Sequence, residues 1–449
     1  MAKQLFGTDG IRGVPGEPPL DDATLFRVGL ALGEYLRSIS PKPEVLIGRD
    51  TRESGPHIEE RIARGLAAAG ADPILAGVLT TPGVAWLVDR EGYAAGVVIS
   101  ASHNPYHDNG VKLISASGMK FPDAVEAEIE DFILSSEGPR APAGAAASHP
   151  GLDEKLHKDY LEGLRARALP GAKFEGMKIV LDCANGAASP LAPELFRSLG
   201  AEVVAMNDAP DGRNINAGCG SLHPEAMRKR AAGLRATFGV AFDGDADRAI
   251  FASGSGKLVD GDGVLLVAGR YLKSAGKLKG DAIVGTAMAN LGLEHALEKS
   301  SLKLVRTAVG DRYVLEEMQK IGANLGGEQS GHILFLDDAT TGDGMLTAVK
   351  MASIISLTGP LDSLVEDLKV FPQAIVNVRV RQKPPLSLLP EVASVLAAAE
   401  KALGSSGRVV VRYSGTEPLA RVMVEAERED DVQRWTATLA SALQACIGA

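Results

Sequence analysis

The stretch VLIGRDTRESGPHIEERIARGLAAAGADPILAG, residues 45–77, contains the pattern that decides the fold. It begins with a short apolar run at residues 45–48 and returns to an apolar run at residues 73–77. Between them, residues 56–69 have a helical pattern that ends at Gly70. A strand, a helix and a second strand in this order predict a βαβ unit with two parallel strands.

The same order recurs twice along the chain. Strand–helix–strand patterns cover residues 178–182, 190–199 and 201–206, and again residues 282–285, 290–299 and 302–306. A further amphipathic helix, expected over residues 21–40, precedes the first unit. Repeated βαβ units predict three related α/β domains with mixed, largely parallel sheets, in which ligands bind beyond the carboxyl ends of strands.

The pattern changes near Phe371. A strand over residues 374–381, a helix over 390–403 and strands over 409–411 and 421–425 predict a smaller α+β domain. Residues 137–150 are rich in Ala, Gly, Pro and Ser and indicate a surface loop near a domain boundary. We therefore expect four domains: residues 1–150, 151–253 and 254–370, all α/β, and residues 371–449, α+β.

The composition excludes several classes of protein. A net charge of −10 without a basic run argues against a nucleic-acid partner. Cys183, Cys219 and Cys446 are too far apart for a zinc site or a disulfide framework, which fits a reducing cytoplasm. The first ten residues lack the apolar core of a signal peptide, and no apolar run approaches the ~18 residues that span a membrane. We expect a cytoplasmic protein without a membrane partner.

The segment ISASHNPYHDNGVK, residues 99–112, follows an apolar strand expected at residues 96–99. It presents Ser102 beyond the strand end, with His103 beside it and Lys112 ten residues further on. A serine hydroxyl is a weak nucleophile unless a base or a metal assists it, and these neighbours suit that role. Turn-forming residues dominate the segment, so a solvated turn explains it equally well.

The segment AFDGDADR, residues 241–248, follows a strand expected at residues 238–242 and supplies Asp243, Asp245 and Asp247. The spacers between them are small, so the backbone can curl until all three carboxylates reach one hard cation such as Mg²⁺, Mn²⁺ or Ca²⁺. An EF-hand loop is excluded, because it needs Gly at its sixth position and Glu at its twelfth, where this chain has Arg248 and Gly254. Three adjacent carboxylates repel one another without a cation, which favours a metal site over a plain acidic turn.

The segment GGEQSGHI, residues 326–333, offers Glu328, Ser330 and His332 on a flexible backbone. These groups suit the hydroxyls of a sugar. A hairpin connection has the same composition, and composition alone does not separate the two interpretations.

The segment RYSGTEPLAR, residues 412–421, places two arginines around a Ser–Gly–Thr turn. Guanidinium forks, hydroxyls and exposed backbone N–H groups together favour a phosphate site. No P-loop is present, because Gly256 and Lys257 are followed by Leu258, and no intact dinucleotide fingerprint appears. The sequence therefore lacks the main motif of an ATP-dependent kinase and that of a dehydrogenase.

Taken in this order, the four loops resemble those of the α-D-phosphohexomutase superfamily, and the resemblance covers essentially the whole chain. The phrases FGTDGIRG (residues 6–13), GGEQSGH and SGTEP (residues 414–418) resemble most the branch that acts on glucosamine phosphates. PDGRNIN (residues 210–216) and VGDRYV (residues 309–314) point the same way. The resemblance implies four domains around a central cleft, with the last domain a mobile phosphate-binding cap.

The resemblance also implies roles for individual residues. Ser102 is expected to carry a phosphoryl group whose oxygen completes a Mg²⁺ site with Asp243, Asp245 and Asp247. The groups expected to assist the transfer are Lys112, a candidate for proton transfer, Arg12, His103 and Arg248. The groups expected to hold the sugar are Glu328 and Ser330, with His332 assisting on that side. The groups expected to hold the phosphate that is not transferred are Arg412, Ser414, Gly415, Thr416 and Arg421.

The reaction implied in this way interconverts glucosamine 6-phosphate and glucosamine 1-phosphate for amino-sugar synthesis. Phosphoserine forms a sugar bisphosphate, which turns around and returns the other phosphate. One Mg²⁺ per subunit and a bisphosphate activator such as glucosamine 1,6-bisphosphate are expected, in a monomer or a homodimer. The alternatives are a phosphoglucomutase or phosphomannomutase of the same superfamily, a non-catalytic sugar-phosphate sensor, and a phosphatase. Two departures from the usual pattern are Ala246, where many relatives carry Gly, and Tyr413, where this branch often has Pro.

Overall fold

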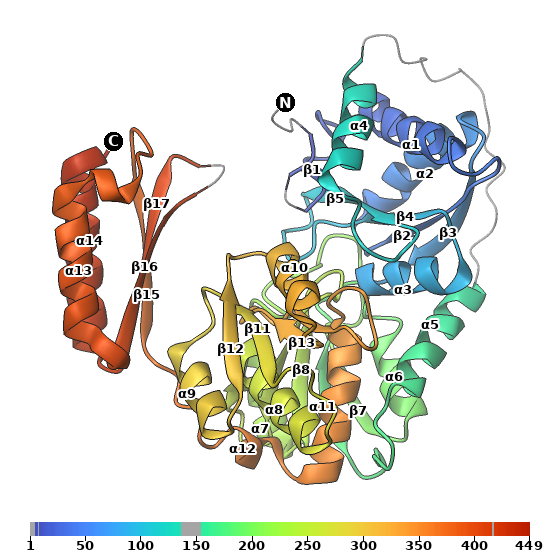
Figure 1. Cartoon of the computed structure of the whole chain (residues 1–449). Helices are drawn as coiled ribbons and strands as arrows, with labels where there is room; N and C mark the ends of the chain where they lie inside the picture. Colours follow the sequence, from blue (N-terminus) through green and yellow to red (C-terminus); the bar gives the residue numbers. More distant parts are fainter. Residues whose placement is uncertain (1–4, 8, 136–153, 415–416) are drawn as a thin grey trace.

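The computed structural model describes residues 5–7, 9–135, 154–414 and 417–449. The boundary loop expected at residues 137–150 lies outside the described residues, as do Gly415 and Thr416. The described chain forms four sheets with helices around them (Figure 1). This architecture confirms the expected fold class of three α/β units and one α+β unit. Within the described residues, none of the helices combines the length and the apolar character needed to cross a bilayer.

The first sheet has the strand order β1-β5-β4-β2-β3. Strands β4, β2 and β3 pair in parallel, whereas β5 pairs antiparallel with β4, and β1 pairs antiparallel with β5. Alternate residues of these strands face opposite sides, so Val45 and Ile47 pack with α1 and α2 whereas Leu46 packs with α3. The elements are β1 (Ile11–Gly13), α1 (Asp22–Arg37), β2 (Glu44–Arg49), α2 (Gly55–Ala68), β3 (Asp72–Val78), α3 (Thr81–Glu91), β4 (Ala95–Ile99), β5 (Asn109–Ser115) and α4 (Asp123–Leu134).

The second sheet repeats this plan with the order β10-β9-β8-β6-β7. Strands β8, β6 and β7 pair in parallel, whereas β9 pairs antiparallel with β8, and β10 pairs antiparallel with β9. The elements are α5 (Glu154–Ala166), β6 (Lys178–Asp182), α6 (Ala192–Ser198), β7 (Glu202–Met206), α7 (Glu225–Leu234), β8 (Phe238–Phe242), β9 (Ala249–Ser253) and β10 (Leu258–Val259).

The third sheet is a shorter version of the same plan, with the order β12-β11-β13-β14 and only β14 antiparallel. The elements are α8 (Gly261–Ser274), β11 (Ala282–Thr286), α9 (Leu291–Lys299), β12 (Lys303–Thr307), α10 (Asp311–Ile321), β13 (Leu325–Gly327), β14 (Ile333–Phe335), α11 (Gly344–Thr358) and α12 (Leu361–Leu364).

Each of the three sheets changes from parallel to antiparallel pairing at one place, and that place carries a loop singled out in the sequence. The changes occur between β4 and β5, between β8 and β9, and between β13 and β14. The serine, aspartate and glutamate loops therefore have equivalent positions in three related sheets.

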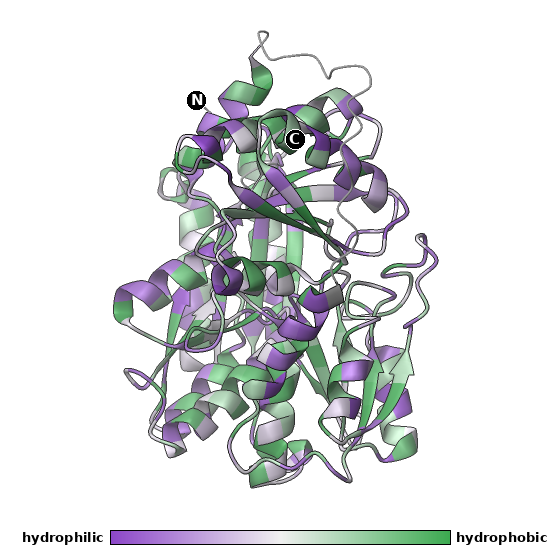
Figure 2. Ribbon diagram, turned by 90° about the vertical axis from the view of Figure 1, so that its right-hand side faces the viewer, coloured by the Kyte–Doolittle hydropathy of each residue, from purple (hydrophilic) through white to green (hydrophobic). Residues whose placement is uncertain are grey.

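One apolar cluster extends through the first three domains, in addition to smaller clusters within single domains. A single cluster of buried side chains includes residues of all three sheets and of α3, α5, α8 and α11. At its centre the buried Tyr160 of α5 donates a hydrogen bond of 2.8 Å to Asp343 Oδ2, the N-cap of α11, and receives one of 3.3 Å from Thr80 Oγ1, the N-cap of α3. Figure 2 shows strands dominated by apolar residues, whereas the outer helices alternate between polar and apolar residues. The three domains are thus packed as one body.

The fourth sheet is antiparallel, with the order β15-β17-β16, and stands to one side of the other three (Figure 1). Its base is tied to the third domain by polar contacts: the buried Glu425 accepts a hydrogen bond from the N–H of Leu291 at 2.8 Å, and Arg408 donates to the carbonyls of Ala287 and Ala289. The elements are β15 (Gln373–Arg379), α13 (Pro390–Leu403), β16 (Gly407–Tyr413), β17 (Leu419–Ala426), α14 (Glu429–Ile447) and the short 3₁₀ turns Leu386–Leu388 and Gly404–Ser406.

Candidate functional site

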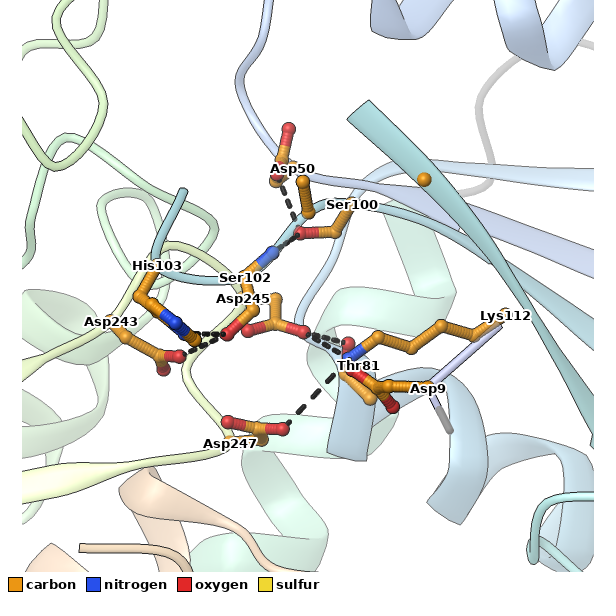
Figure 3. Close-up of polar contacts among 12 residues, drawn as sticks. Asp9, Asp50, Thr81, Ser100, Ser102, His103, Lys112, Asp243, Asp245 and Asp247 are labelled. Atoms are coloured by element: carbon orange, nitrogen blue, oxygen red, sulfur yellow. Dashed lines mark hydrogen bonds and ion pairs between the residues drawn. The ribbon is translucent and has the colours of Figure 1, made fainter. Parts of the chain in front are cut away.

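Ser102 lies in the loop between β4 and β5 and is only 2% exposed. Its Oγ donates a hydrogen bond of 2.6 Å to Asp243 Oδ2 in the second domain and lies 3.1 Å from Nδ1 of His103 (Figure 3). The backbone of Ser102 has φ = 52°, a left-handed conformation that L-residues adopt rarely. A solvated turn does not describe this loop, because its serine is buried and directed at a carboxylate.

The three aspartates lie in the loop between β8 and β9, and a carboxylate oxygen of each lies within 4.8 Å of the others. Ala246 adopts φ = 57°, so the departure from Gly noted in the sequence places an alanine in a left-handed conformation that glycine adopts without strain. Gly244 allows the two loops to meet, since a Cβ at this position would stand 2.4 Å from the carbonyl oxygen of Ser102.

The electrostatics of this cluster fit a hard divalent cation. Burial and the negative charges of Asp247 and Asp245 raise the pKa of Asp243 well above its ordinary value. Although burial acts in the same direction on Asp247, the ion pair with His332 and the positive charge of Lys112 lower its pKa. The Oδ1 atoms of Asp245 and Asp247 are buried and have no hydrogen-bond partner among the described residues. A cation bound by oxygen ligands would use these unpartnered atoms and relieve the repulsion.

Lys112 of β5 extends into the same cluster and is 2% exposed. Its Nζ lies 2.9 Å from Asp245 Oδ2 and 3.1 Å from Asp9 Oδ2. Burial alone would lower the pKa of Lys112, but Asp245, Asp9 and Asp247 outweigh it and raise that pKa well above its ordinary value. Arg12 of β1 donates to the same Asp9 oxygen at 2.7 Å and to the Ala101 carbonyl at 3.2 Å. Two cations therefore flank the Ser102 loop.

His103 and Arg248 meet on the other side of the serine. Arg248 Nη1 lies 3.2 Å from His103 Nδ1. Burial and the positive charges of Arg248 and Arg12 lower the pKa of His103, which keeps the imidazole neutral. A neutral ring can accept a hydrogen bond at Nδ1 while the guanidinium stays close to the serine.

Comparison with known proteins identifies the family. Four profiles of the phosphoglucomutase/phosphomannomutase family match this chain in order: α/β/α domain I over residues 3–139, domain II over residues 158–256, domain III over residues 260–371, and the C-terminal domain over residues 375–442. The chain belongs to the phosphoglucomutase/phosphomannomutase family.

Curated relatives match over the full length. A phosphoglucosamine mutase of Solibacter usitatus is 52% identical over 450 residues, covering 100% of both chains. A phosphoglucosamine mutase of Koribacter versatilis is 52% identical over 454 residues, covering 99% of this chain and 98% of the relative.

Solved structures share the fold. A phosphoglucomutase/phosphomannomutase family protein of Burkholderia thailandensis is 25% identical, with a TM-score of 0.80 over 98% of this chain and 97% of that one. The N-acetylphosphoglucosamine mutase of Aspergillus fumigatus, solved in complex with GlcNAc-6P and magnesium, is 19% identical, with a TM-score of 0.63 over 99% of this chain and 96% of that one.

The third-domain loop of this phosphohexomutase is a hairpin connection, as its composition allowed, and it also reaches the site. His332 Nδ1 lies 3.6 Å from Asp247 Oδ2, and this ion pair raises the pKa of the imidazole although burial opposes it. The ring fills the space beside Gly342, where a Cβ would stand 2.4 Å from His332 Nε2. Glu328 accepts hydrogen bonds from the Gly310 N–H at 3.1 Å and from the Ser330 hydroxyl at 3.3 Å.

The described residues of the fourth-domain segment form no hydrogen bond or ion pair with the Ser102 loop. Arg412 and Arg421 are direct cross-strand partners on β16 and β17, and no hydrogen bond or ion pair links either to the first three domains within the described residues. Burial and the charge of Arg421 lower the pKa of Arg412. Ser414 is buried, whereas Gly415 and Thr416 lie outside the described residues. Two opposed arginines repel each other and therefore suit an anion.

Sequence reasoning missed several groups at this site. Asp9 accepts from Arg12, Lys112 and Lys120, and Thr81 Oγ1 donates to Asp245 Oδ2 at 2.6 Å. Asp9 stands in the phrase FGTDGIRG, three positions before Arg12, so its motif was noticed but its role was not. Thr81 begins α3 directly after a strand, and no local pattern indicates that it reaches another domain.

Proposed function

We propose that this protein is a phosphomutase that interconverts glucosamine 6-phosphate and glucosamine 1-phosphate through a phosphoserine at Ser102. The observation that carries the proposal is the buried Ser102 hydroxyl, 2.6 Å from Asp243 and between Lys112 and Arg12 on one side and Arg248 on the other. The full-length relatives at 52% identity bear the name of this activity, which supports the same substrate.

The proposed transfer moves one phosphoryl group and one proton. The bond between phosphorus and Ser102 Oγ breaks, and a bond between phosphorus and a sugar hydroxyl oxygen forms. The raised pKa of Lys112 keeps it an ammonium, so it can give a proton to the departing Oγ and recover one from the sugar hydroxyl. Phosphoryl transfer depends mainly on positioning and charge stabilisation, which Arg12, Arg248 and Lys112 provide. The reverse transfer from the other end of the bisphosphate returns the phosphoryl group to Ser102.

Mg²⁺ is the proposed resident cation, held by Asp243, Asp245 and Asp247 with an oxygen of the phosphorylated Ser102. When bound, it would stabilise the charge that develops on the transferred group. The all-oxygen donor set favours Mg²⁺ over metals that prefer nitrogen or sulfur. A sugar bisphosphate, glucosamine 1,6-bisphosphate or a related compound, is the proposed activator.

Recognition of the sugar is proposed for Glu328 and Ser330, and recognition of the distal phosphate for Arg412, Ser414, Gly415, Thr416 and Arg421. Glu328 is a carboxylate that could accept from an ammonium or from a hydroxyl, so a mutase for glucose or mannose phosphates is the second candidate. Hydrolysis would be disfavoured if the fourth domain closes over the bound sugar phosphate and excludes water from the transferred group. The intact serine, aspartates and lysine argue against a silent sensor.

The decisive experiment measures kcat/KM with Mg²⁺ and a trace of bisphosphate for glucosamine 6-phosphate, glucose 6-phosphate and mannose 6-phosphate under identical conditions. Preference for the amino sugar supports the proposal. Preference for a neutral sugar keeps the mechanism and changes the substrate, whereas release of inorganic phosphate alone supports a phosphatase. Binding without turnover supports a sensor.

We also propose a cytoplasmic location, because three cysteines that form no disulfide suit a reducing compartment. The oligomeric state is proposed to be a monomer or a homodimer. Sedimentation of the purified chain distinguishes the two.

A further inference from the structure

Arg52 is a fully buried arginine directly behind the Ser102 loop, and no motif in the sequence points to it. It follows β2 and has 0% exposure. Its guanidinium donates to backbone carbonyls of Ser102 at 3.0 Å, Asn104 at 2.8 Å and Asp108 at 2.9 Å, and also to that of Pro105. One side chain thus holds four carbonyls of the loop that carries the nucleophile.

Asp50 links Arg52 to the backbone N–H of Ser102 through the hydroxyl of Ser100. Arg52 Nε donates to Asp50 Oδ2 at 2.9 Å, and the Ser100 hydroxyl donates to the same oxygen at 2.6 Å (Figure 3 shows Asp50, Ser100 and Ser102). Ser100 Oγ in turn accepts the backbone N–H of Ser102 at 2.9 Å. The peptide groups on both sides of the Ser102 Cα are therefore fixed, the N–H through Ser100 and the carbonyl through Arg52.

The conformation of Ser102 explains why such fixing is needed. Its φ of 52° is unfavourable for an L-residue, so this conformation persists only where the surroundings hold it. Asn216 of the second domain helps, since its Nδ2 donates to the Ser102 carbonyl at 2.8 Å and to that of Asn104 at 3.1 Å. Relaxation of Ser102 to an ordinary backbone conformation would turn its Oγ away from Asp243.

We propose that Arg52, acting with Asp50 and Ser100, is a positioning residue for phosphoryl transfer, which holds Ser102 in the left-handed conformation that directs Oγ at the carboxylate cluster. The inference rests on the proposed function, because it assigns a role in that transfer. Within the described residues, Arg52 bonds to the backbone of Ser102 and forms no hydrogen bond or ion pair with the side chains proposed to hold the sugar or Mg²⁺. Its effect is therefore expected on the chemical step and not on binding of the sugar phosphate, for which groups of the third and fourth domains are proposed.

The test compares Arg52→Lys and Ser100→Ala with the wild type. Lysine keeps the positive charge beside Asp50 but loses the planar fork that reaches several carbonyls at once. We expect Arg52→Lys to lower kcat by about tenfold to a hundredfold, the loss typical of a displacement of roughly 1 Å, with KM within about twofold of the wild type. Ser100→Ala leaves the Arg52–Asp50 pair intact, and a smaller loss of kcat is expected. Arg49→Lys is the matched control. The Arg49 side chain contacts Glu59 and the Asp50 carbonyl, and within the described residues it forms no hydrogen bond or ion pair with the Ser102 loop.

Two readouts separate positioning from a general structural role. Thermal denaturation measures folding, and intact-mass spectrometry follows the rate at which glucosamine 1,6-bisphosphate phosphorylates Ser102 in a single turnover. The inference predicts slower phosphorylation in folded Arg52→Lys and Ser100→Ala, and unchanged phosphorylation in Arg49→Lys. If Arg52→Lys does not fold, Ser100→Ala decides the test.

Folded variants that phosphorylate Ser102 at the wild-type rate would overturn the inference, as would an increase of KM with kcat unchanged. A loss of kcat that only follows the fraction of unfolded protein would do the same. A wild-type protein that never phosphorylates Ser102 would overturn the proposed function itself, and the inference with it. The wild-type reaction therefore distinguishes failure of the one from failure of the other.

Discussion

The Oγ of Ser102 and the Oδ2 of Asp243 lie 2.6 Å apart, although they belong to different domains and are separated by 141 positions in the chain. Contacts across the same boundary support this pair: Thr81 N–H donates to the Asp245 carbonyl at 3.1 Å, and Thr81 Oγ1 donates to its carboxylate. The nucleophile and the carboxylates are thus aligned by the packing of one domain against the next, which makes the interface part of the catalytic apparatus proposed here.

Replacing the nucleophile should abolish turnover and leave the fold intact. Ser102→Ala removes the only oxygen of this side chain, so no phosphoryl group can be carried, while the loop keeps its bonds to Arg52 and Ser100. We expect no isomerisation above background and a thermal midpoint close to that of the wild type. The measurements are the mutase assay and differential scanning calorimetry; full activity in the variant would refute the phosphoserine mechanism.

Neutralising one carboxylate should weaken the binding of Mg²⁺ and lower the rate. In Asp245→Asn the cluster loses one of three negative charges, so the Mg²⁺ concentration for half-maximal activity should rise by at least about tenfold and the maximal rate should fall. Asp337→Asn, which removes an exposed carboxylate paired with Lys279, is the control and should titrate like the wild type. An unchanged magnesium curve in Asp245→Asn would contradict the metal assignment.

Removing one of the opposed arginines should weaken substrate binding. Arg412→Ala deprives a distal phosphate of a charged donor on the fourth domain, and we expect KM for the sugar phosphate to rise by about tenfold or more. Arg428→Ala is the control, because Arg428 lies in the same domain and pairs only with Asp430 and Asp431 among its ion pairs in the described residues. Equal KM values for the two variants would argue against a phosphate site between β16 and β17.

The buried Asp343 should make stability depend on pH. Burial raises its pKa from 3.8 to about 6. The native state therefore binds more protons than the unfolded state between these pH values, and the carboxyl destabilises the fold increasingly as pH rises, by about 2–3 kcal/mol at pH 7. Asn at this position can still cap α11 and removes the charge. Asp343→Asn should thus gain thermal stability relative to the wild type between pH 4.5 and pH 7.

The control for this pH dependence is Asp362→Asn. Burial opposes ionisation of Asp362, but hydrogen bonds from Ser253 and Ser255 outweigh it and lower the pKa. Its stabilising effect is complete above the unfolded value of 3.8 and is lost only at lower pH. The melting-temperature difference between Asp362→Asn and the wild type should therefore stay constant from pH 4.5 to pH 7, and a constant difference for Asp343→Asn would contradict its raised pKa.

The sequence predicted some of the elements whose pattern is local, but the amphipathic helices α5, α10 and α14 were not expected. The helix and strands around residues 45–77 were expected within a few residues of α2, β2 and β3, because strand–helix alternation and the stop at Gly70 are visible along the chain. The helix α11 was not expected. Its residues from Gly344 to Ile355 are all buried, so no polar face alternates with an apolar one and the periodicity that reveals a surface helix is missing.

By itself, the sequence determined the order of the units, the family resemblance and the identity of the groups in each loop, because strand and helix periods, turn residues and motif letters are properties of neighbouring positions. The resemblance implied that Ser102, Lys112 and the three aspartates share one site, and only the tertiary structure decided the contacts that no motif implies. Asp9 beside Lys112, Thr81 against Asp245 and Arg52 behind Ser102 join residues up to 164 positions apart. Such contacts depend on how the sheets and their shared core pack in space, and no local pattern along the chain records that packing.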